Sequence, residues 1–299
     1  MKFEILFLGT GDAVPTARRN HPGFLVSFAN ENILVDCGEG MQRQFRIAGV
    51  TPMRLTKILL THLHGDHVFG LPGLLRTLVL LDYPGKLNVY GPRWTKAYLK
   101  LLEEVALTPR EKLNMEVHEV SGKFVENKDY YIESVEMKHG IPANAYAIVF
   151  KDKRRLDKKK LRKLKLPNSP LIGKLQRGED VMFNGKKIRS KDVCYIEKGK
   201  KIVFIMDTGM NENAVKIARG ADLLVCESTF MGKDIELAKE RNHLTALQAA
   251  TIAKKARVKK LVLTHISQRY EKNLDAVLKE ARKVFKNSIL ARDFDKIVV

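Results

Sequence analysis

The sequence predicts an α/β fold in which helices cover β-sheets. Three observations support this prediction: short apolar runs recur along the chain, segments with apolar residues at helical spacing separate them, and Gly, Asp or Asn marks the junctions. The chain has 299 residues and is 44% hydrophobic, which is enough to bury a substantial core. Strands that alternate with helices form layers, with the helices packed on the faces of the sheets.

In the first half of the chain, short apolar runs indicate strands. The predicted strands are Phe3 to Leu8, Phe24 to Phe28, Ile33 to Val35, Lys57 to Leu60, Leu87 to Tyr90, Tyr130 to Val135 and Tyr146 to Phe150. Helical spacing predicts the helices Gly40 to Ala48, Leu71 to Leu81 and Thr95 to Leu102.

The same alternation returns after residue 200. The predicted strands are Ile202 to Met206, Leu223 to Cys226 and Leu261 to Leu263, and the predicted helices are Asn211 to Ala218, Thr245 to Arg257 and Leu274 to Phe285. We therefore expect one domain that spans residues 1–299 and carries a single insertion.

The insertion, residues 151–193, breaks this alternation. Ten of the fifteen positions from Lys151 to Lys165 are Lys or Arg, and Pro167-Asn168-Ser169-Pro170 follows. Because the segment offers few apolar residues to bury, we expect it to protrude from the body or to be mobile. It is either a solvated surface insertion or an arm that binds a polyanion.

The charge of the whole chain favours an anionic partner. The 54 Lys and Arg exceed the 34 Asp and Glu, and the formal net charge is +20. Such a surplus attracts polyanions, and nucleic acid is the natural candidate. A Lys-rich composition without any partner, as in some thermophilic proteins, is the alternative.

Cysteine spacing and hydropathy favour a cytoplasmic protein. Cys37, Cys194 and Cys226 lie far apart and lack the spacing of a disulfide framework or a thiolate zinc site, so we expect them to fill the core in a reducing compartment. No apolar stretch reaches the roughly 20 residues of a membrane span, and no secretory leader is evident.

A dense histidine cluster follows one of the predicted strands. The segment His62-Leu63-His64-Gly65-Asp66-His67 contains three histidines and one aspartate. Imidazole nitrogens and carboxylate oxygens suit zinc, and a catalytic zinc keeps a position open for water, whose pKa falls to about 7. One metal needs about three protein ligands. These four residues, with others downstream, therefore indicate two metals.

Three further apolar runs end in a residue that can bind metal. They end in His139, Asp207 and His265. Each residue alone would usually be an ordinary surface or core residue. Together with the histidine cluster, they become the expected remaining ligands of a site built along one edge of a sheet.

This ligand series resembles that of the metallo-β-lactamase superfamily over nearly the whole chain. The resemblance implies an αββα sandwich of two mixed sheets, with two zinc ions at one edge. It also implies that His62, His64 and His139 hold one zinc, that Asp66, His67 and His265 hold the other, and that Asp207 bridges them. Asp66 would orient the bridging hydroxide and accept its proton.

Finer motifs resemble the ribonuclease Z branch of that superfamily. They are the Gly-rich turn Leu8 to Pro15 with the following Thr16 to Asn20, and the segments Cys226 to Phe230, His243 to Ala246 and Thr264 to Tyr270. This resemblance implies a homodimer that hydrolyses precursor tRNA just 3′ of the discriminator nucleotide. The tRNA would keep a 3′-hydroxyl, and the trailer would carry a 5′-phosphate.

The resemblance also implies roles for residues outside the ligand series. His243 would contact a phosphate or protonate the departing 3′-oxygen, with Glu227 as a partner that raises its pKa. Alternatively, His243 merely neighbours the start of a helix. The residues expected to contact RNA in this region are Arg18, Arg19, Asn20 and Arg269. Arg269 and Tyr270 could instead pack the last metal-bearing loop.

Ribonuclease Z enzymes carry an exosite arm where residues 151–193 lie, and that arm clamps the elbow of tRNA. The run Pro170 to Gly178 resembles part of the arm, although Ser169 stands where the family often has Gly, which could change the hinge. Lys158, Lys159, Lys160 and Lys163 are expected to contact RNA. Such contacts read phosphates and shape rather than sequence. In the family, the arm of one subunit serves substrate held by the other.

Three alternatives stay open at this point. A related binuclear zinc hydrolase of a small ester, thioester or phosphodiester would be active without the arm. A non-catalytic RNA-binding protein is disfavoured by the complete ligand set. Zinc-dependent DNA nucleases and the cleavage-factor branch of RNA nucleases carry a further large domain, for which 299 residues leave no room.

Overall fold

The computed structural model describes residues 3–29, 31–108 and 111–299, which form two compact units. The sandwich unit comprises the chain as far as Glu126, together with Ile132–Ile148 and Lys201–Val299. The insertion unit comprises Asn127–Tyr131 and Val149–Lys200. It is thus somewhat longer than the insertion expected from the sequence.

Two seven-stranded sheets form the centre of the fold. The first has the order β18 (Lys296–Val298), β1 (Glu4–Gly9), β2 (Gly23–Phe28), β3 (Glu31–Val35), β4 (Leu55–Leu59), β5 (Leu87–Gly91) and β6 (Met115–Glu119). The second has the order β17 (Ser288–Leu290), β16 (Leu261–Thr264), β15 (Leu223–Glu227), β14 (Lys201–Ile205), β9 (Asn144–Phe150), β8 (Tyr130–Glu136) and β7 (Gly122–Glu126).

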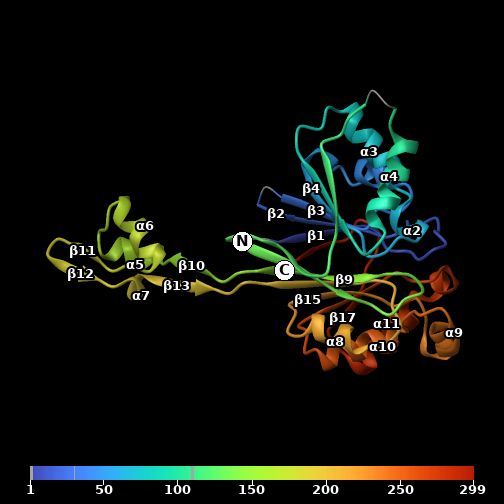
Figure 1. Ribbon diagram of the computed structural model, residues 1–299. Coiled ribbons are helices and arrows are strands. Elements are labelled where there is room, and N and C mark those ends of the chain that lie inside the picture. Colours follow the sequence, from blue (N-terminus) through green and yellow to red (C-terminus); the bar gives the residue numbers. More distant parts are fainter. Residues whose placement is uncertain (1–2, 30, 109–110) are drawn as a thin grey trace. The chain divides into compact units, whose positions relative to one another are not determined.

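Helices cover the outer faces of both sheets (Figure 1). The first sheet is covered by α1 (Met41–Ile47), α3 (Leu71–Leu80) and α4 (Thr95–Ala106), and the second by α8 (Glu212–Ala218), α10 (Ala246–Lys255) and α11 (Leu274–Val284). Shorter elements of this unit are α2 (Gly65–Val68), α9 (Ile235–Glu240) and the 3-10 turns Pro52–Arg54, Gly232–Asp234 and Gln268–Asn273. The expected αββα sandwich is confirmed.

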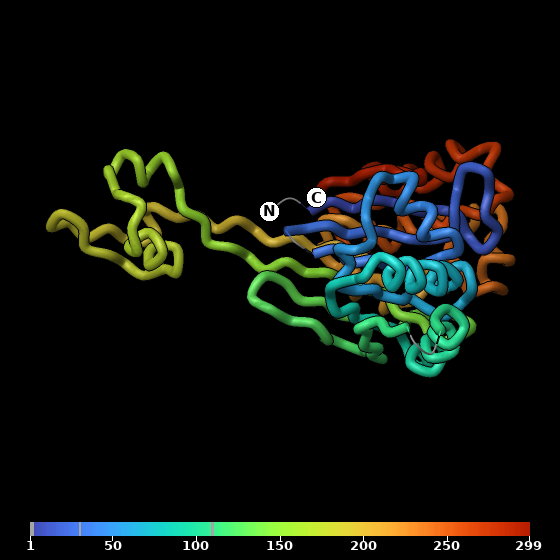
Figure 2. The backbone as a smooth tube through the Cα atoms, turned by 90° about the horizontal axis from the view of Figure 1, so that it is seen from above, coloured from blue at the N-terminus to red at the C-terminus, as the bar shows by residue number. Residues whose placement is uncertain are grey.

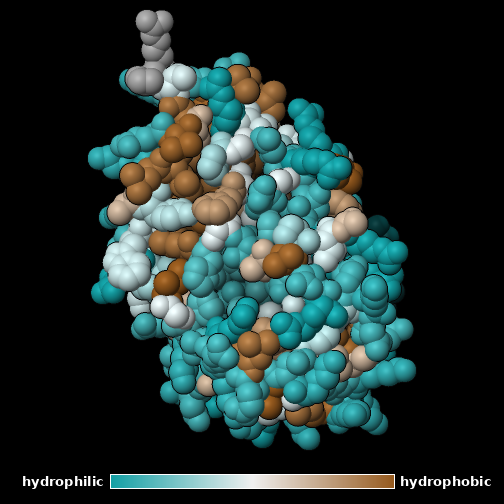
Figure 3. Space-filling model, turned by 90° about the vertical axis from the view of Figure 1, so that its right-hand side faces the viewer, coloured by the Kyte–Doolittle hydropathy of each residue, from teal (hydrophilic) through white to brown (hydrophobic). Residues whose placement is uncertain are grey.

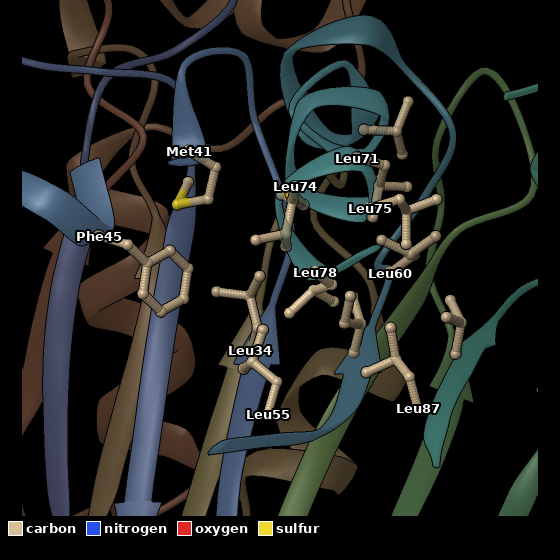
Figure 4. Packing of buried hydrophobic residues seen from close by; sticks show 14 of the residues in the cluster. Leu34, Met41, Phe45, Leu55, Leu60, Leu71, Leu74, Leu75, Leu78 and Leu87 are labelled. Carbon is tan, nitrogen blue, oxygen red and sulfur yellow. The ribbon is translucent and has the colours of Figure 1, made fainter. Parts of the chain in front are cut away.

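Helix α3 shows how the helical spacing produces this packing. Its fully buried residues Leu71, Leu74, Leu75 and Leu78 recur at intervals of three and four, and therefore form one stripe along the helix. In Figure 4 this stripe faces Leu34 and Leu55 of the first sheet. Each fully buried leucine contributes about 1.5–3 kcal/mol to the hydrophobic stabilisation of the core.

Strand direction determines where the functional residues can lie. In the first sheet β3, β4, β5 and β6 run parallel, and in the second β14, β15, β16 and β17 run parallel. Loops that follow neighbouring parallel strands leave a sheet at the same edge. At the opposite side of the first sheet, the C-terminal strand β18 pairs antiparallel with β1, so the first and last strands lie side by side (Figure 2).

The insertion unit has ordered elements of its own. Strands β10 (Lys153–Leu156) and β13 (Cys194–Glu197) pair antiparallel, as do β11 (Val181–Phe183) and β12 (Lys186–Ile188). Its helices are α5 (Lys158–Lys163), α6 (Pro170–Arg177) and α7 (Ser190–Val193).

The premise that this segment offers few apolar residues to bury was wrong, and its protrusion stays a prediction. A small core is formed by Leu161, Leu166, Leu175, Val181, Ile188 and Val193. The physical reason is visible in α5, where Leu161 is buried while the lysines before it are exposed. The many basic residues make the segment hydrophilic on average, but its apolar residues still pack together. Among the helices described in both units, none is long and apolar enough to cross a membrane.

Candidate active site

The expected ligands meet at one edge of the sandwich because they lie on segments that follow the ends of strands. His62 lies just beyond β4, Asp207 just beyond β14, and His265 directly after β16. His64 precedes the first turn of α2, and this short helix then carries Asp66 and His67. The local sequence therefore delivers all of these side chains to the same place.

Potential ligands form three groups there; one contains Glu227, His243 and His265, and the other two contain the expected ligands. Of these two, the first contains His62, His64, His139 and Asp207, and the second contains Asp66, His67, Asp207 and His265. Within each group, one donor atom from every residue lies within 4.8 Å of those of the others. Asp207 belongs to both groups, with its Oδ2 3.5 Å from His62 Nε2 and its Oδ1 3.1 Å from His265 Nε2.

The chemistry of these donors fits bound cations. His62 Nε2 lies 3.0 Å from His64 Nδ1, and His67 Nε2 lies 3.3 Å from His265 Nε2. Ring nitrogens that face one another at such distances can share a metal ion. Buried Asp207 Oδ1 has no hydrogen-bond partner among the described atoms. A buried carboxylate oxygen without a donor is costly unless a cation satisfies it.

Burial and charge set the protonation of the histidines. Burial holds the pKa of His62 well below its usual value, and burial also lowers the pKa values of His64 and His139. These imidazoles are neutral, which is the form that binds a metal. For His67, burial acts in the same direction, but Asp66, Asp207 and Asp36 outweigh it and raise the pKa. A metal that binds there displaces the proton from His67.

Asp36 is a functional residue that was not expected from the sequence. It follows β3 and is fully buried, with a left-handed backbone at φ 58°. Its carboxylate accepts hydrogen bonds from Thr61 N (2.7 Å), Thr61 Oγ1 (2.8 Å) and His67 Nδ1 (2.8 Å). His67 therefore presents Nε2 to the second group. The only sequence signal was an aspartate directly after an apolar strand, in Val35-Asp36-Cys37-Gly38.

Two threonine hydroxyls connect carboxylates to ligand histidines in the same way. Thr61 Oγ1 donates to Asp36 and, 3.1 Å away, accepts from His62 Nδ1. Thr229 Oγ1 donates to Glu227 Oε2 at 2.6 Å and accepts from His265 Nδ1 at 2.8 Å. A carboxylate only accepts, so each hydroxyl must donate to it and accept from the ring. Both rings are thereby fixed with Nε2 toward the ligand groups.

His243 lies beside the second group, paired with buried Glu227. Its Nδ1 donates to Glu227 Oε1 at 3.1 Å, and its Nε2 lies 3.8 Å from Asp207 Oδ2. Burial alone would lower the pKa of His243, but Glu227 and Asp207 outweigh it and raise the pKa to about 9. His243 is therefore a cation at neutral pH, and can donate a proton or bind an anion. Helix α10 begins after its capping residue Thr245, so His243 lies two residues before the cap and does not itself cap the helix.

The residues expected to contact RNA differ in accessibility. Arg18 is exposed, whereas Arg19 is 3% exposed and donates to Thr10 Oγ1 and the Ala291 carbonyl. Asn20 donates to the Glu39 carbonyl. These bonds give Arg19 and Asn20 a structural task in the loop, and their contact with RNA stays a prediction.

The other residues of that set lie on two different units. The guanidinium of Arg269 lies 5.2 Å from the ring centre of Phe230, and the Tyr270 hydroxyl donates to Asp234. This arrangement matches the packing alternative for buried Tyr270, whereas Arg269 is exposed and its contact with RNA stays a prediction. Lys158, Lys159, Lys160 and Lys163 are exposed on α5 of the insertion unit.

Comparisons with known proteins agree with this geometry. The ribonuclease Z of Archaeoglobus fulgidus is 39% identical over 304 aligned positions, which cover 100% of this chain and 98% of that protein. The ribonuclease Z of Methanosarcina acetivorans is 36% identical, with 99% and 98% covered. The crystal structure of the short form of human tRNase Z superposes with a TM-score of 0.71 at 27% identity, with 98% of each chain covered.

Two further similarities are broader. The metallo-β-lactamase fold protein YhfI from Bacillus subtilis superposes with a TM-score of 0.71 at 19% identity and full coverage of both chains, which supports the fold alone. A family model described as Anti-Pycsar protein Apyc1 matches residues 3–158. That match contains the histidine cluster and His139 but ends before Asp207 and His265.

Proposed function

Because this chain belongs to the ribonuclease Z family, a family of tRNA 3′-processing endoribonucleases, we propose that it hydrolyses precursor tRNA just 3′ of the discriminator nucleotide. The tRNA keeps a 3′-hydroxyl, and the trailer leaves with a 5′-phosphate. The observation that carries this proposal is the carboxylate of Asp207, shared by two groups of ligands in a chain that aligns over its whole length with ribonuclease Z relatives.

The proposed cofactor is a pair of zinc ions. His62, His64 and His139 would hold one ion and Asp66, His67 and His265 the other, with Asp207 between them. Bound ions of this kind supply an activated hydroxide and neutralise charge that develops on phosphate oxygens. A ligand set rich in histidine suits zinc, although Mn²⁺ or Fe²⁺ would fit the same donors.

The protein's own groups would move the protons. Asp66 lies at the edge of the second ligand group, and although burial raises its pKa, His67 and His265 hold it far below the usual range. It is therefore ionised, and it would orient the attacking water and accept its proton, as the family resemblance implies. Protonated His243 would donate to the departing 3′-oxygen, and Glu227 would keep it protonated.

The insertion unit is the proposed grip on tRNA. Four exposed lysines on α5, which are Lys158, Lys159, Lys160 and Lys163, offer contacts to phosphates while Leu161 anchors the helix in the small core. We propose further that the enzyme is a cytoplasmic homodimer in which this unit acts as an exosite for substrate at the partner's site. The family resemblance and the basic net charge of +20 support this part of the proposal.

A second candidate is hydrolysis of a small ester, thioester or phosphodiester. It is favoured by one observation: the groups of potential metal ligands found among the described residues all lie in the sandwich unit, so hydrolysis itself would not require the insertion.

A deletion of the insertion separates the two candidates. Phe150 N donates to the Lys200 carbonyl at 2.8 Å, so residues 152–198 can be replaced by a short Gly-Ser linker without separating the strand ends. The shortened, metal-loaded protein should lose most of its affinity for precursor tRNA but still hydrolyse bis-p-nitrophenyl phosphate. Asp66→Ala should abolish both activities, and Asp275→Ala, at an exposed position on α11, should leave both intact. Equal cleavage of precursor tRNA with and without the insertion would contradict the exosite.

A further inference from the structure

We infer that Trp94, with Arg93, forms a stacking platform for an unpaired nucleobase of the substrate beside the cut. This inference rests on the proposed function, because it assigns a binding task to a loop that the metal ligands and the insertion do not explain.

The first observation is that few of the described aromatic side chains are exposed, and that one of them is Trp94. Among the described Phe, Tyr and Trp residues, the exposed ones are Phe69 (56%), Trp94 (50%) and Tyr195 (55%). Tyr195 belongs to the insertion unit, so the sandwich unit exposes two. Phe69 directly follows α2, two residues after His67, and Trp94 directly precedes α4. Large aromatic rings usually bury most of their surface.

The second observation is that the loop of Trp94 lies next to the histidine cluster. Strands β4 and β5 are parallel neighbours, with Leu59 opposite Tyr90, and Leu60 N continues the ladder with a bond to the Tyr90 carbonyl. From there one strand leads to His62, and the other leads through Gly91 and Pro92 to Arg93 and Trp94. Both loops therefore emerge at the same edge of the first sheet.

Hydrogen bonds tie these two loops together. Asn144 N donates to the Thr61 carbonyl at 2.8 Å, and the Asn144 side chain donates to the Val120 carbonyl at 3.1 Å. Val120 N in turn donates to the Gly91 carbonyl. The backbone that carries Trp94 is thus fixed relative to the residue just before His62. Figure 3 is viewed from the side on which α2 lies in Figure 1, and on this face hydrophobic side chains interrupt a largely hydrophilic surface.

The third observation is the conformation of Trp94. Its backbone lies in the left-handed region, at φ 80° and ψ −4°, which is disfavoured for a bulky side chain. Surrounding bonds hold it there: Tyr98 N donates to the Trp94 carbonyl at 3.0 Å, and Thr95 Oγ1 donates to the Pro92 carbonyl at 2.7 Å. The fold therefore holds the Trp94 backbone in a strained conformation and leaves half of its side chain exposed.

The fourth observation is the charge beside the ring. The guanidinium of Arg93 lies 4.6 Å from the centre of the Trp94 ring, and both residues are exposed. A cation stacked on one face of an indole adds positive charge beside the ring, and a base can stack on the other face. Bases of single-stranded RNA stack on such faces, whereas bases inside a double helix do not offer theirs. The occupant is therefore an unpaired base next to the cut, on either the trailer or the tRNA side.

Trp94 is the sole tryptophan of the chain, which allows a direct test. Metal-free protein, which cannot cut, is titrated with a short oligoribonucleotide that matches the trailer and separately with one that matches the tRNA 3′ end. The indole emission should change strongly with one of the two, and the change should disappear when the stacked nucleotide is abasic. The responding oligonucleotide identifies the side of the cut. Unchanged emission at saturating concentrations of both oligonucleotides and of whole precursor would refute the platform.

A kinetic comparison tests the same inference in the active enzyme. Trp94→Ala should lower kcat/KM for precursor tRNA about 10-fold, which corresponds to one base stacked on an aromatic ring, and Trp94→Phe should keep most of the activity. The affinity of both variants for Zn²⁺ should be unchanged. With a precursor that is abasic at the stacked position, wild type and Trp94→Ala should become equal.

Other outcomes identify the error. If Trp94→Ala also loses affinity for Zn²⁺, the residue supports the fold or the metals and the platform is wrong. If it changes the oligomeric state in sedimentation while cleavage per active site is unchanged, the ring packs against another copy instead. If wild type does not cut the precursor at all, the proposed function fails, and the fluorescence titration still decides whether Trp94 stacks on a base.

Discussion

Replacement of Thr229 by valine should weaken one of the two metal positions selectively. The hydroxyl of Thr229 joins Glu227 Oε2, at 2.6 Å, to His265 Nδ1, at 2.8 Å, and is almost fully buried. Valine has nearly the same shape but no hydroxyl. It leaves the Nδ1–H of His265 without an acceptor and removes one donor from Glu227, so the ring loses the contact that points its Nε2 toward the second ligand group.

The expected loss of metal affinity is that of removing a group that orients a metal-binding histidine. Loss of a group that orients a metal-binding histidine typically costs 10–100-fold in metal affinity, or about 1.4–2.7 kcal/mol. The first ligand group has its own relay through Thr61, so its affinity should change little. Thr229→Ser retains the hydroxyl and should bind both metals nearly as wild type does.

The assay is calorimetric titration of metal-free protein with Zn²⁺, combined with nitrogen NMR of the His265 ring to detect a change of tautomer. Thr264→Val is a matched control, because Thr264 is also buried next to His265 but its Oγ1 has no hydrogen-bond partner among the described atoms. It should leave both affinities unchanged. The reasoning is refuted if Thr229→Val binds both ions as tightly as wild type, or if Thr229→Ser is as impaired as Thr229→Val.

Three further predictions test neighbouring parts of the site. Asp36→Asn should weaken the metal affinity of both positions about 10–100-fold, because Asp36 orients His67 directly and His62 through Thr61. The control is Asp293→Asn, which changes a carboxylate bonded to Thr10 and Asn20 and should leave the calorimetric metal affinities intact. An equal loss of metal affinity in both variants would contradict this role of Asp36. Glu227→Gln removes the carboxylate that, with Asp207, raises the pKa of His243 to about 9. The proton-donating form of His243 exists below its pKa, so kcat/KM of the wild type should fall as the pH rises through that value. In the variant, kcat/KM should begin to fall at a lower pH. If both proteins lose activity over the same alkaline pH range, His243 is not the acid. Removal of metal with a chelator should abolish cleavage, and Zn²⁺ should restore it, as followed by gel assay; full activity after chelation would exclude a metal-dependent reaction.

The central strands and the ligand series could be predicted from the sequence because their signals are local. A run such as Ile202 to Met206 is apolar on both faces, and the strand predicted there lies one residue from the observed Lys201–Ile205. The histidine cluster is contiguous, and the remaining ligands follow apolar runs in the same way. The helix Leu71 to Leu81 was likewise readable from its leucine spacing, and α3 ends one residue earlier.

The edge strands and the core of the insertion were not predicted, for different reasons. Strand β6, Met115–Glu119, is partly exposed and alternates with Glu and His, so its apolar content is too low to stand out. In the insertion unit, leucines are scattered among basic residues, and only the three-dimensional arrangement shows that they meet. Average composition therefore does not reveal a core as small as this one.

The groups that orient the metal ligands were missed because their roles depend on contacts between distant segments. Asp36 bonds Thr61 and His67, which are 25 and 31 positions away, and Thr229 bonds His265, which is 36 positions away. An isolated Asp or Thr carries no signal of such a partner. Trp94 was also missed, because its exposure and left-handed backbone become visible only in the folded chain.

The most direct test of the central claim is to map the ends of the products made from a precursor tRNA with a 3′ trailer. The account predicts one cut just 3′ of the discriminator, with a 3′-hydroxyl on the tRNA, a 5′-phosphate on the trailer, and no cut by Asp66→Ala. An uncut precursor, in the presence of metal-loaded wild-type protein that hydrolyses a small ester or thioester, would leave the fold and ligand groups in place and contradict the assignment to RNA.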